Sequence, residues 1–165
     1  MRYLAKLALS ATIPLVALFA YPSSATDESA PMVAVGVGDI MIEGALARAT
    51  SPDQTTARAF AIVKNRGGVD DVLLSASADF ASRVAFGEPK LVGDTKNMVL
   101  LPAGVVIPAG GAVELRPDET QILLIDLKQK LTKGDTITVT LNFGLNGSVE
   151  VPFTVGGHDA KAPSQ

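Results

Sequence analysis

The stretch VVIPAGGAVELRPDETQILLIDLKQKLTKGDTITVTLNF, residues 105–143, holds the clearest strand pattern of the chain. Within residues 136–143 every second residue is apolar, which is the period of a β-strand with one buried face. The threonines and Asn142 between the apolar positions would face water, as in an antiparallel sheet that is solvated on one side. The apolar positions, which we expect to face a core, are Ile137, Val139, Leu141 and Phe143.

Outward from this stretch, strand patterns and turns alternate along the chain. Residues 122–125 are apolar at every position, which favours a strand that is covered on both faces. Asn146-Gly147 is a strong hairpin signal, and Gly44 indicates a bulge. With no long amphipathic helix in the pattern, the sequence predicts an all-β fold, an antiparallel β-sandwich or barrel. The predicted strands cover residues 37–48, 59–65, 71–78, 82–86, 96–101, 113–115, 120–127, 135–143 and 148–155.

The first 25 residues have the pattern of a signal peptide. Arg2 and Lys6 precede an apolar run of about 13 residues, and small residues follow at 23–25. Because this run is too short to span a bilayer, we expect cleavage near Ala25 and a periplasmic or secreted protein. No later run is apolar enough for a membrane span, so we expect none in the mature chain. The expected organisation is a signal peptide (1–25), a linker (26–35), one domain (36–156) and a flexible tail (157–165).

Charge and composition exclude several function classes. Cleavage would change the formal net charge from −3 to −5, and an acidic chain without basic clusters is a poor ligand for nucleic acid. The sequence has no cysteine, which excludes a thiolate nucleophile, a cysteine zinc site and a blue-copper centre. Its one histidine, His158, lies in the Gly-rich tail, so we expect no Ser-His-Asp triad. No spacing singles out a pair of carboxylates, and we expect no enzyme activity.

Four motifs follow one another along nearly the whole mature chain. They are ALARAT (45–50), AFAIVKNRG (59–67) with Asp70-Asp71 and Leu73, IPAGGAVELRP (107–117), and LKQKL (127–131) with Gly134-Asp135 and VTLNF (139–143). In this order they resemble the motifs A-W-A-R-x-[TP], A-Y-x-x-I-x-N-x-G…DD-x-L, I-P-A-G-G-x-V-E-L-K-P and L-K-x-P-L…G-D…L-T-L-x-F of the periplasmic copper-chaperone family PCuAC. Leu46 stands in place of the tryptophan of the first motif.

The resemblance implies a cupredoxin-like Greek-key β-sandwich. It also implies a function, which in this family is to carry Cu(I) in the periplasm and help deliver it to the copper centre of cytochrome oxidase. The partner would be a cytochrome oxidase subunit or another copper-handling protein. Copper would pass to it by ligand exchange, without catalysis.

The family's copper ligands are a histidine, a methionine with ten residues between the two, and a later H-x-M pair. The resemblance places these four ligands at Gly87, Met98, Gln121 and Leu123. Only Met98 keeps a donor that suits the soft Cu(I) ion, because a hard amide oxygen is a poor substitute and the other two positions have no side-chain donor. The resemblance therefore implies a degenerate metal site.

Two interpretations remain open. In the first, Met98 is a surviving copper ligand, joined by His158 or by donors from a partner, and the chain serves cytochrome oxidase assembly or copper homeostasis. In the second, the chain is a divergent member without metal. It then uses the surface around Glu88, Met98 and Gln121 to bind a protein or a small ligand, while Met98 is an apolar packing residue and His158 is solvated.

Overall fold

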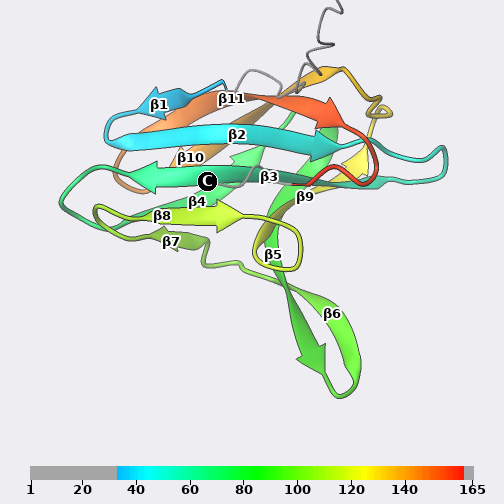
Figure 1. The fold of residues 1–165 in the computed structure, drawn as a ribbon, viewed down its shortest axis with the longest axis horizontal. Coiled ribbons are helices and arrows are strands. Elements are labelled where there is room, and N and C mark those ends of the chain that lie inside the picture. Colours follow the sequence, from blue (N-terminus) through cyan, green and yellow to red (C-terminus); the bar gives the residue numbers. More distant parts are fainter. Residues whose placement is uncertain (1–32, 162–165) are drawn as a thin grey trace, which may run out of the picture.

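The computed structural model describes residues 33–161, which contain eleven β-strands and no helix (Figure 1). Accordingly, no helix within this range could cross a membrane. The predicted signal peptide with its cleavage near Ala25, most of the linker, and the last four residues lie outside the described residues. The strands are β1 (Val35–Val37), β2 (Ile40–Arg48), β3 (Thr56–Asn65), β4 (Asp71–Ser77), β5 (Ala81–Val92), β6 (Thr95–Leu100), β7 (Val105–Ile107), β8 (Ala112–Leu115), β9 (Gln121–Leu127), β10 (Thr136–Phe143) and β11 (Gly147–Gly156).

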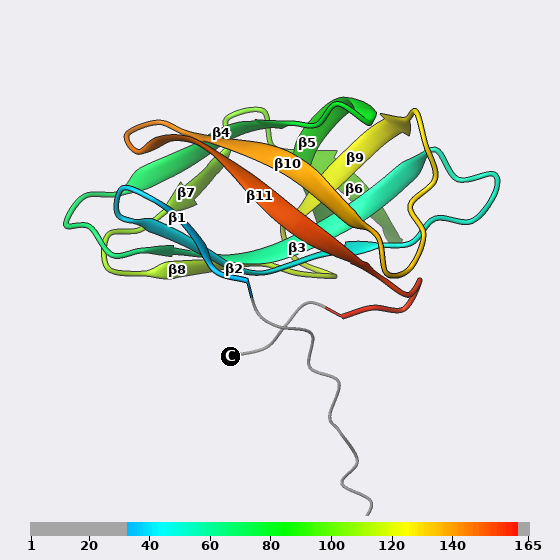
Figure 2. The same cartoon turned by 90° about the horizontal axis from the view of Figure 1, so that it is seen from above.

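The strands form one mixed sheet that folds over into two packed layers. The main path runs β6-β5-β9-β3-β2-β11-β10-β4-β7, with β1 added to β2 and β8 added to β3. Seen from above, β4 and β10 lie on one side and β2 and β3 on the other, with β11 running between them (Figure 2). The predicted all-β, cupredoxin-like sandwich is confirmed. Side chains of its core include Ile42, Val63, Leu73, Leu124, Val139, Leu141 and Phe153.

The alternation predicted for β10 is present in the structure. The four apolar residues expected to face the core are all buried, and those between them are exposed or half-buried. The β10–β11 hairpin turns through residues 144–146, and Gly147, which begins β11 opposite Phe143, has a φ of 83°, a left-handed conformation that favours glycine. The bulge predicted at Gly44 is also confirmed, because the β2–β3 register shifts between Glu43 and Leu46.

The observed strand pattern differs from the prediction in several places. The sheet is not wholly antiparallel, because β11 pairs in parallel with β2, with Val155 opposite Ala47. The period of a strand reports which face is buried and not which strand lies beside it, so the pattern could not give this pairing. A turn at Gly38 and Asp39 divides the predicted first strand into β1 and β2, and the three-residue β7 was missed.

The β5–β6 hairpin is longer than predicted. The sequence predicts a loop between residues 86 and 96, but β5 continues to Val92 and β6 begins at Thr95. Pro89 argued against a strand here, yet it lies beyond Gly87, where the pairing of β5 with β9 has ended. A sheet tolerates proline at such an edge position. The hairpin projects from the sandwich (Figure 1) and carries Met98 with it.

Candidate metal site

The residues at the four predicted ligand positions come together in the structure. β5 brings Gly87 opposite Gln121 of β9, and Leu123 lies two residues further along β9. β6 places Met98 opposite Pro89, two residues beyond Gly87. Residues two apart in a strand face the same side of a sheet, so all four positions share one face. We call Gly87, Met98, Gln121 and Leu123 the ligand-position cluster.

Leu123 and Met98 fill the space beside Gly87. A Cβ atom at position 87 would lie 2.9 Å from Cδ1 of Leu123 and 3.1 Å from Sδ of Met98. A side chain fits at this position only if these groups shift. Leu123 is 7% exposed and Met98 is half-buried. Side chains of the protein itself therefore occupy the place where the resemblance puts a histidine.

Gln121 is the buried polar group of the cluster. Its side chain is 1% exposed, and its Nε2 donates to Sδ of Met98 at 3.9 Å, a weak bond because a thioether is a weak acceptor. Its Oε1 is buried and has no hydrogen-bond partner within residues 33–161. Such an unpaired acceptor costs about 1–3 kcal/mol. Oε1 is therefore available to accept a hydrogen bond.

The donors of the cluster do not fit a Cu(I) ion. Cu(I) prefers thioether, thiolate and imidazole ligands, and the cluster supplies one thioether from Met98. Gln121 supplies an amide, and Gly87 and Leu123 supply no donor. Across the described part of the chain, moreover, no group of three or more His, Cys, Asp or Glu side chains is placed to hold a metal ion.

The other predicted donor, His158, lies elsewhere. It lines a hollow of about 380 Å³ together with Arg48 and Arg58, which lie on β2 and β3. The sheet order puts β3 three strands from β6, or about 14 Å at a spacing of about 4.8 Å. The described chain thus does not bring His158 to Met98. Glu88, beside the cluster, forms an ion pair with Lys90 at 2.6 Å.

Comparison with known families assigns this chain. The sequence profile of a family described as "Putative lipoprotein LpqE-like" matches residues 40–155, nearly the whole sandwich. The chain belongs to the LpqE-like family. One curated relative, "Putative lipoprotein Lxx21020" of Leifsonia xyli subsp. xyli, is 34% identical over 96 residues, which are 57% of this chain and 58% of the relative. The LpqE-like chain therefore matches just over half the length of that protein.

Solved structures similar to the LpqE-like chain are PCuAC domains. The copper-bound PCuAC domain from PmoF2 has a TM-score of 0.65 and 22% identity, covering 76% of this chain and 99% of that domain. The apo PmoF2 PCuAC domain has a TM-score of 0.67 and 24% identity, and the match covers 79% of this chain and 100% of that domain. Cu(I)-bound DR1885 from Deinococcus radiodurans has a TM-score of 0.59 and 24% identity, and the match covers 78% of this chain and 83% of that chain. These structures confirm the predicted PCuAC fold.

Two residues beside His158 were not predicted as site residues. Arg48 belongs to the ALARAT motif, and Arg58 follows ten residues later on β3. The sequence did hold a signal for this pair, because Ser51-Pro52-Asp53 has the composition of a turn and lies midway between the two arginines. A hairpin centred on Asp53 places residues 48 and 58 opposite each other.

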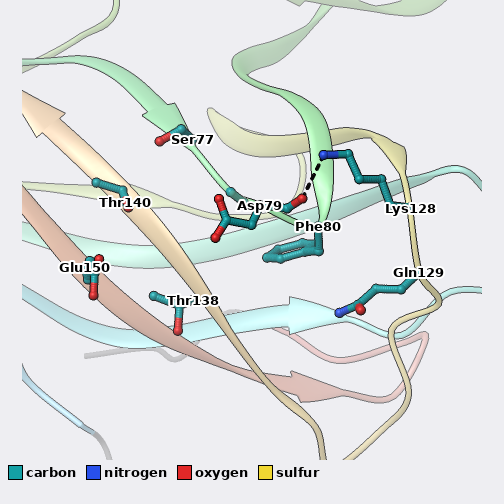
Figure 3. A pocket seen from close by; sticks show the side chains of 9 residues that line it. Ser77, Asp79, Phe80, Lys128, Gln129, Thr138, Thr140 and Glu150 are labelled. Atoms are coloured by element: carbon teal, nitrogen blue, oxygen red, sulfur yellow. Dashed lines mark hydrogen bonds between the residues drawn. The ribbon is translucent and has the colours of Figure 1, made fainter.

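Another hollow of the LpqE-like chain, of about 560 Å³, lies over β10, β11 and the segment after β4 (Figure 3). Its lining includes the side chains of Asp79, Phe80, Thr138 and Glu150. Nζ of Lys128 donates to the backbone oxygen of Asp79 at 2.9 Å. The lining contains neither histidine nor methionine, so this hollow offers no soft donor for Cu(I) and no imidazole base.

Proposed function

We propose that the LpqE-like chain is an exported, non-catalytic binding domain of the PCuAC type that does not hold Cu(I) tightly by itself. The packing of the ligand-position cluster is the observation that carries this proposal. Leu123 and Met98 fill the space beside Gly87, as the distances of 2.9 Å and 3.1 Å from a Cβ at that position indicate. The PCuAC fold is kept, and binding of a protein or a small ligand takes the place of metal binding.

Both chemistry and packing oppose Cu(I) binding by one chain. A single thioether leaves the rest of the coordination to oxygen donors, which Cu(I) binds poorly. Opening the cluster would also expose Leu123, and exposing a buried leucine costs about 1.5–3 kcal/mol. The parent chain therefore lacks the ligands for the ion, and a side chain at position 87 would require Leu123 and Met98 to move.

A second candidate function is Cu(I) transfer shared with a partner. It is favoured by the position of Met98, a half-buried thioether on the projecting β5–β6 hairpin. The remaining ligands would come from His158 or from the partner, a cytochrome oxidase subunit or another copper-handling protein. The role would then be cytochrome oxidase assembly or copper homeostasis.

The proposed location is the periplasm or the outside of the cell. Residues 1–25 have the signal-peptide pattern, with cleavage near Ala25. The lipoprotein descriptions of the family and of the Leifsonia relative agree with export. The proposal for this chain does not include a cysteine-linked lipid, because the 165 residues contain no cysteine.

A Cu(I) titration against a competing chelator, under reducing conditions, separates the two candidates. The chain from residue 26 is compared with Met98→Leu and with a triple variant, Gly87→His, Gln121→His and Leu123→Met, which restores the ligand set of the family. We expect no stoichiometric binding by the parent or by Met98→Leu. The triple variant should bind one equivalent, because the strand registers already bring its four ligands together.

Tight binding by the parent that weakens in Met98→Leu would overturn the first proposal. A pull-down from periplasmic extract then tests the partner. Partners recovered equally with and without a copper chelator support a metal-free binding domain. Partners recovered only in the presence of copper support the shared transfer site.

A further inference from the structure

Arg48 and Arg58 lie opposite each other on neighbouring strands. The β2–β3 register pairs Ala47 with Ala59, so the next position on each strand is an arginine. Directly opposed residues of an antiparallel pair have Cβ atoms about 4.5–5.5 Å apart on the same face. Two positive charges there repel each other, which destabilises the sheet unless a negative charge is close.

Within the part of the chain that the structure describes, no carboxylate neutralises this pair. Within residues 33–161, no carboxylate oxygen lies within 4.0 Å of either guanidinium. Arg48 is nevertheless fixed, because its guanidinium carbon lies 5.2 Å from the centroid of the Phe60 ring and its Nε donates to the carbonyl oxygen of Ala160 at 2.9 Å. In the described chain its Nη groups donate to no protein acceptor. Arg48 is thus a positioned donor with unused N–H groups.

Three further polar side chains gather around the two arginines. The parallel pairing of β11 with β2 sets Gly156 opposite Arg48, which brings the following turn with His158 to the same place. Ser51 and Gln54 come from the connection between β2 and β3. Oε1 of Gln54 accepts from the backbone N of Ser51 at 3.2 Å, which leaves the amide nitrogen of Gln54 as a donor. Ala49 and Ala57 complete the lining of this hollow of about 380 Å³.

We propose that this arginine hollow binds an oxyanion, a carboxylate or a phosphate group, between Arg48 and Arg58. A guanidinium presents its N–H donors as a fork whose geometry matches both kinds of oxyanion. The bound anion would also remove the repulsion between the opposed arginines. His158, Ser51 and Gln54 supply additional donors around it.

The local charge favours an anion over other ligands. The whole chain has a formal net charge of −3, yet this hollow is lined by two arginines and no carboxylate. Asp53 and Asp159 are near in sequence, but both are exposed and neither lines the hollow. A metal cation would be repelled by the guanidinium groups.

The arginine hollow is independent of the copper question. Its nearest member of the ligand-position cluster is Leu123, which lies opposite Arg58 in the β3–β9 pair and offers no donor. Oxyanion binding therefore requires neither copper nor Met98. A negative copper titration would therefore leave the oxyanion site untouched, and a negative oxyanion titration would leave the proposed function untouched.

The test is a titration of the purified chain with inorganic phosphate and, separately, with citrate, in a low-salt buffer free of other oxyanions, followed by amide chemical shifts. We expect saturable shifts in residues 48–58 and 156–160. Arg58→Gln should weaken binding by about tenfold, because it removes one charged donor pair. Arg66→Gln is the matched control, since Arg66 is an exposed arginine just past the opposite end of β3, and it should leave binding unchanged.

The outcomes decide both the site and the source of the anion. Saturation by phosphate but not citrate assigns a phosphate ligand, and the reverse assigns a carboxylate ligand. Arg58→Lys, which keeps the charge but loses the fork, should fall between the parent and Arg58→Gln. The proposal is overturned by an absence of saturable binding for both probes, or by equal weakening in Arg58→Gln and Arg66→Gln. Thermal melts of the variants without anion show whether each remains folded.

Discussion

Replacing Asp71 by asparagine tests how much the hydrogen bonds of this buried carboxylate stabilise the sandwich. Asp71 is 1% exposed at the start of β4. Its Oδ1 accepts from the backbone N of Val72 at 2.7 Å and of Leu145 at 2.9 Å. Its Oδ2 accepts from the backbone N of Asn146 at 3.2 Å and from Nδ2 of Asn146 at 2.8 Å. The carboxylate thus holds the β10–β11 turn against β4.

The magnitude follows from this arrangement. Each oxygen accepts two hydrogen bonds, so an amide at this position loses two of them whichever way it is turned. A hydrogen bond to a charged group contributes about 1.5–3 kcal/mol. We therefore expect Asp71→Asn to lower the free energy of unfolding by about 3–6 kcal/mol, with the upper end reached if the donors that face the new NH₂ stay unpaired.

Urea unfolding at pH 7 measures this loss. The matched control is Asp70→Asn, because Asp70 is exposed and accepts one hydrogen bond, from the backbone N of Ala109 at 2.8 Å. We expect the control to lose less than about 1.5 kcal/mol. If both variants lost the same amount, the hydrogen bonds of Asp71 would not be the source of the stability assigned to them.

The pH dependence gives a second readout of the same group. Burial by itself would raise the pKa of Asp71, but the hydrogen bonds from Asn146, Leu145 and Val72 outweigh it and hold the pKa below its ordinary value of 3.8. A lowered folded-state pKa stabilises the fold fully above the unfolded pKa and loses that contribution as the pH falls through the folded pKa. Below about pH 3.8 the stability of the parent should therefore fall more steeply than that of Asp71→Asn.

Two other predictions concern the core and a close backbone approach. Leu141→Ala and Phe143→Ala should each lower the free energy of unfolding by about 2–5 kcal/mol, because both side chains are buried in the core; thermal melts that match the parent would mean that the β10 register is wrong. Gly104→Ala should cost more than about 2 kcal/mol in urea unfolding, since φ is 81° and a Cβ would lie 2.4 Å from the backbone oxygen of Leu73. Gly110→Ala, with φ of 64° and no atom within 4 Å of its Cβ, should cost about 1 kcal/mol, and equal losses at the two glycines would contradict the role of the close approach.

The sequence predicted those parts of the fold that depend only on residues close together in the chain. The alternation of β10 and the Asn146-Gly147 turn need only neighbouring residues, and both are confirmed. The parallel pairing of β11 with β2 depends on how two distant strands meet, which no local period contains. The length of β5 was missed because Pro89 reads as a strand breaker, although it lies where the pairing with β9 has ended.

The sequence predicted where the four ligand positions lie, but it did not predict how the side chains pack around them. Matching the family motifs placed four ligand positions on the chain, and the registers of β5, β6 and β9 bring them to one face. Motif spacing could not tell that Leu123 and Met98 fill the space at Gly87, since this depends on side chains from three strands. The arginine hollow was missed for a related reason, because Arg48 and Arg58 become neighbours only across a strand pair.

These observations explain how the sheet can carry different side chains at the four ligand positions and keep its fold. The positions of the ligand-position cluster are set by backbone hydrogen bonds of the β5–β6 and β5–β9 ladders, which do not depend on the side chains they carry. Burying Leu123 there contributes about 1.5–3 kcal/mol, and no ion is needed to obtain it. The unpaired Oε1 of Gln121 is the remaining cost of this arrangement. Replacing Gln121, which is 1% exposed, by an apolar residue of similar size would remove that cost.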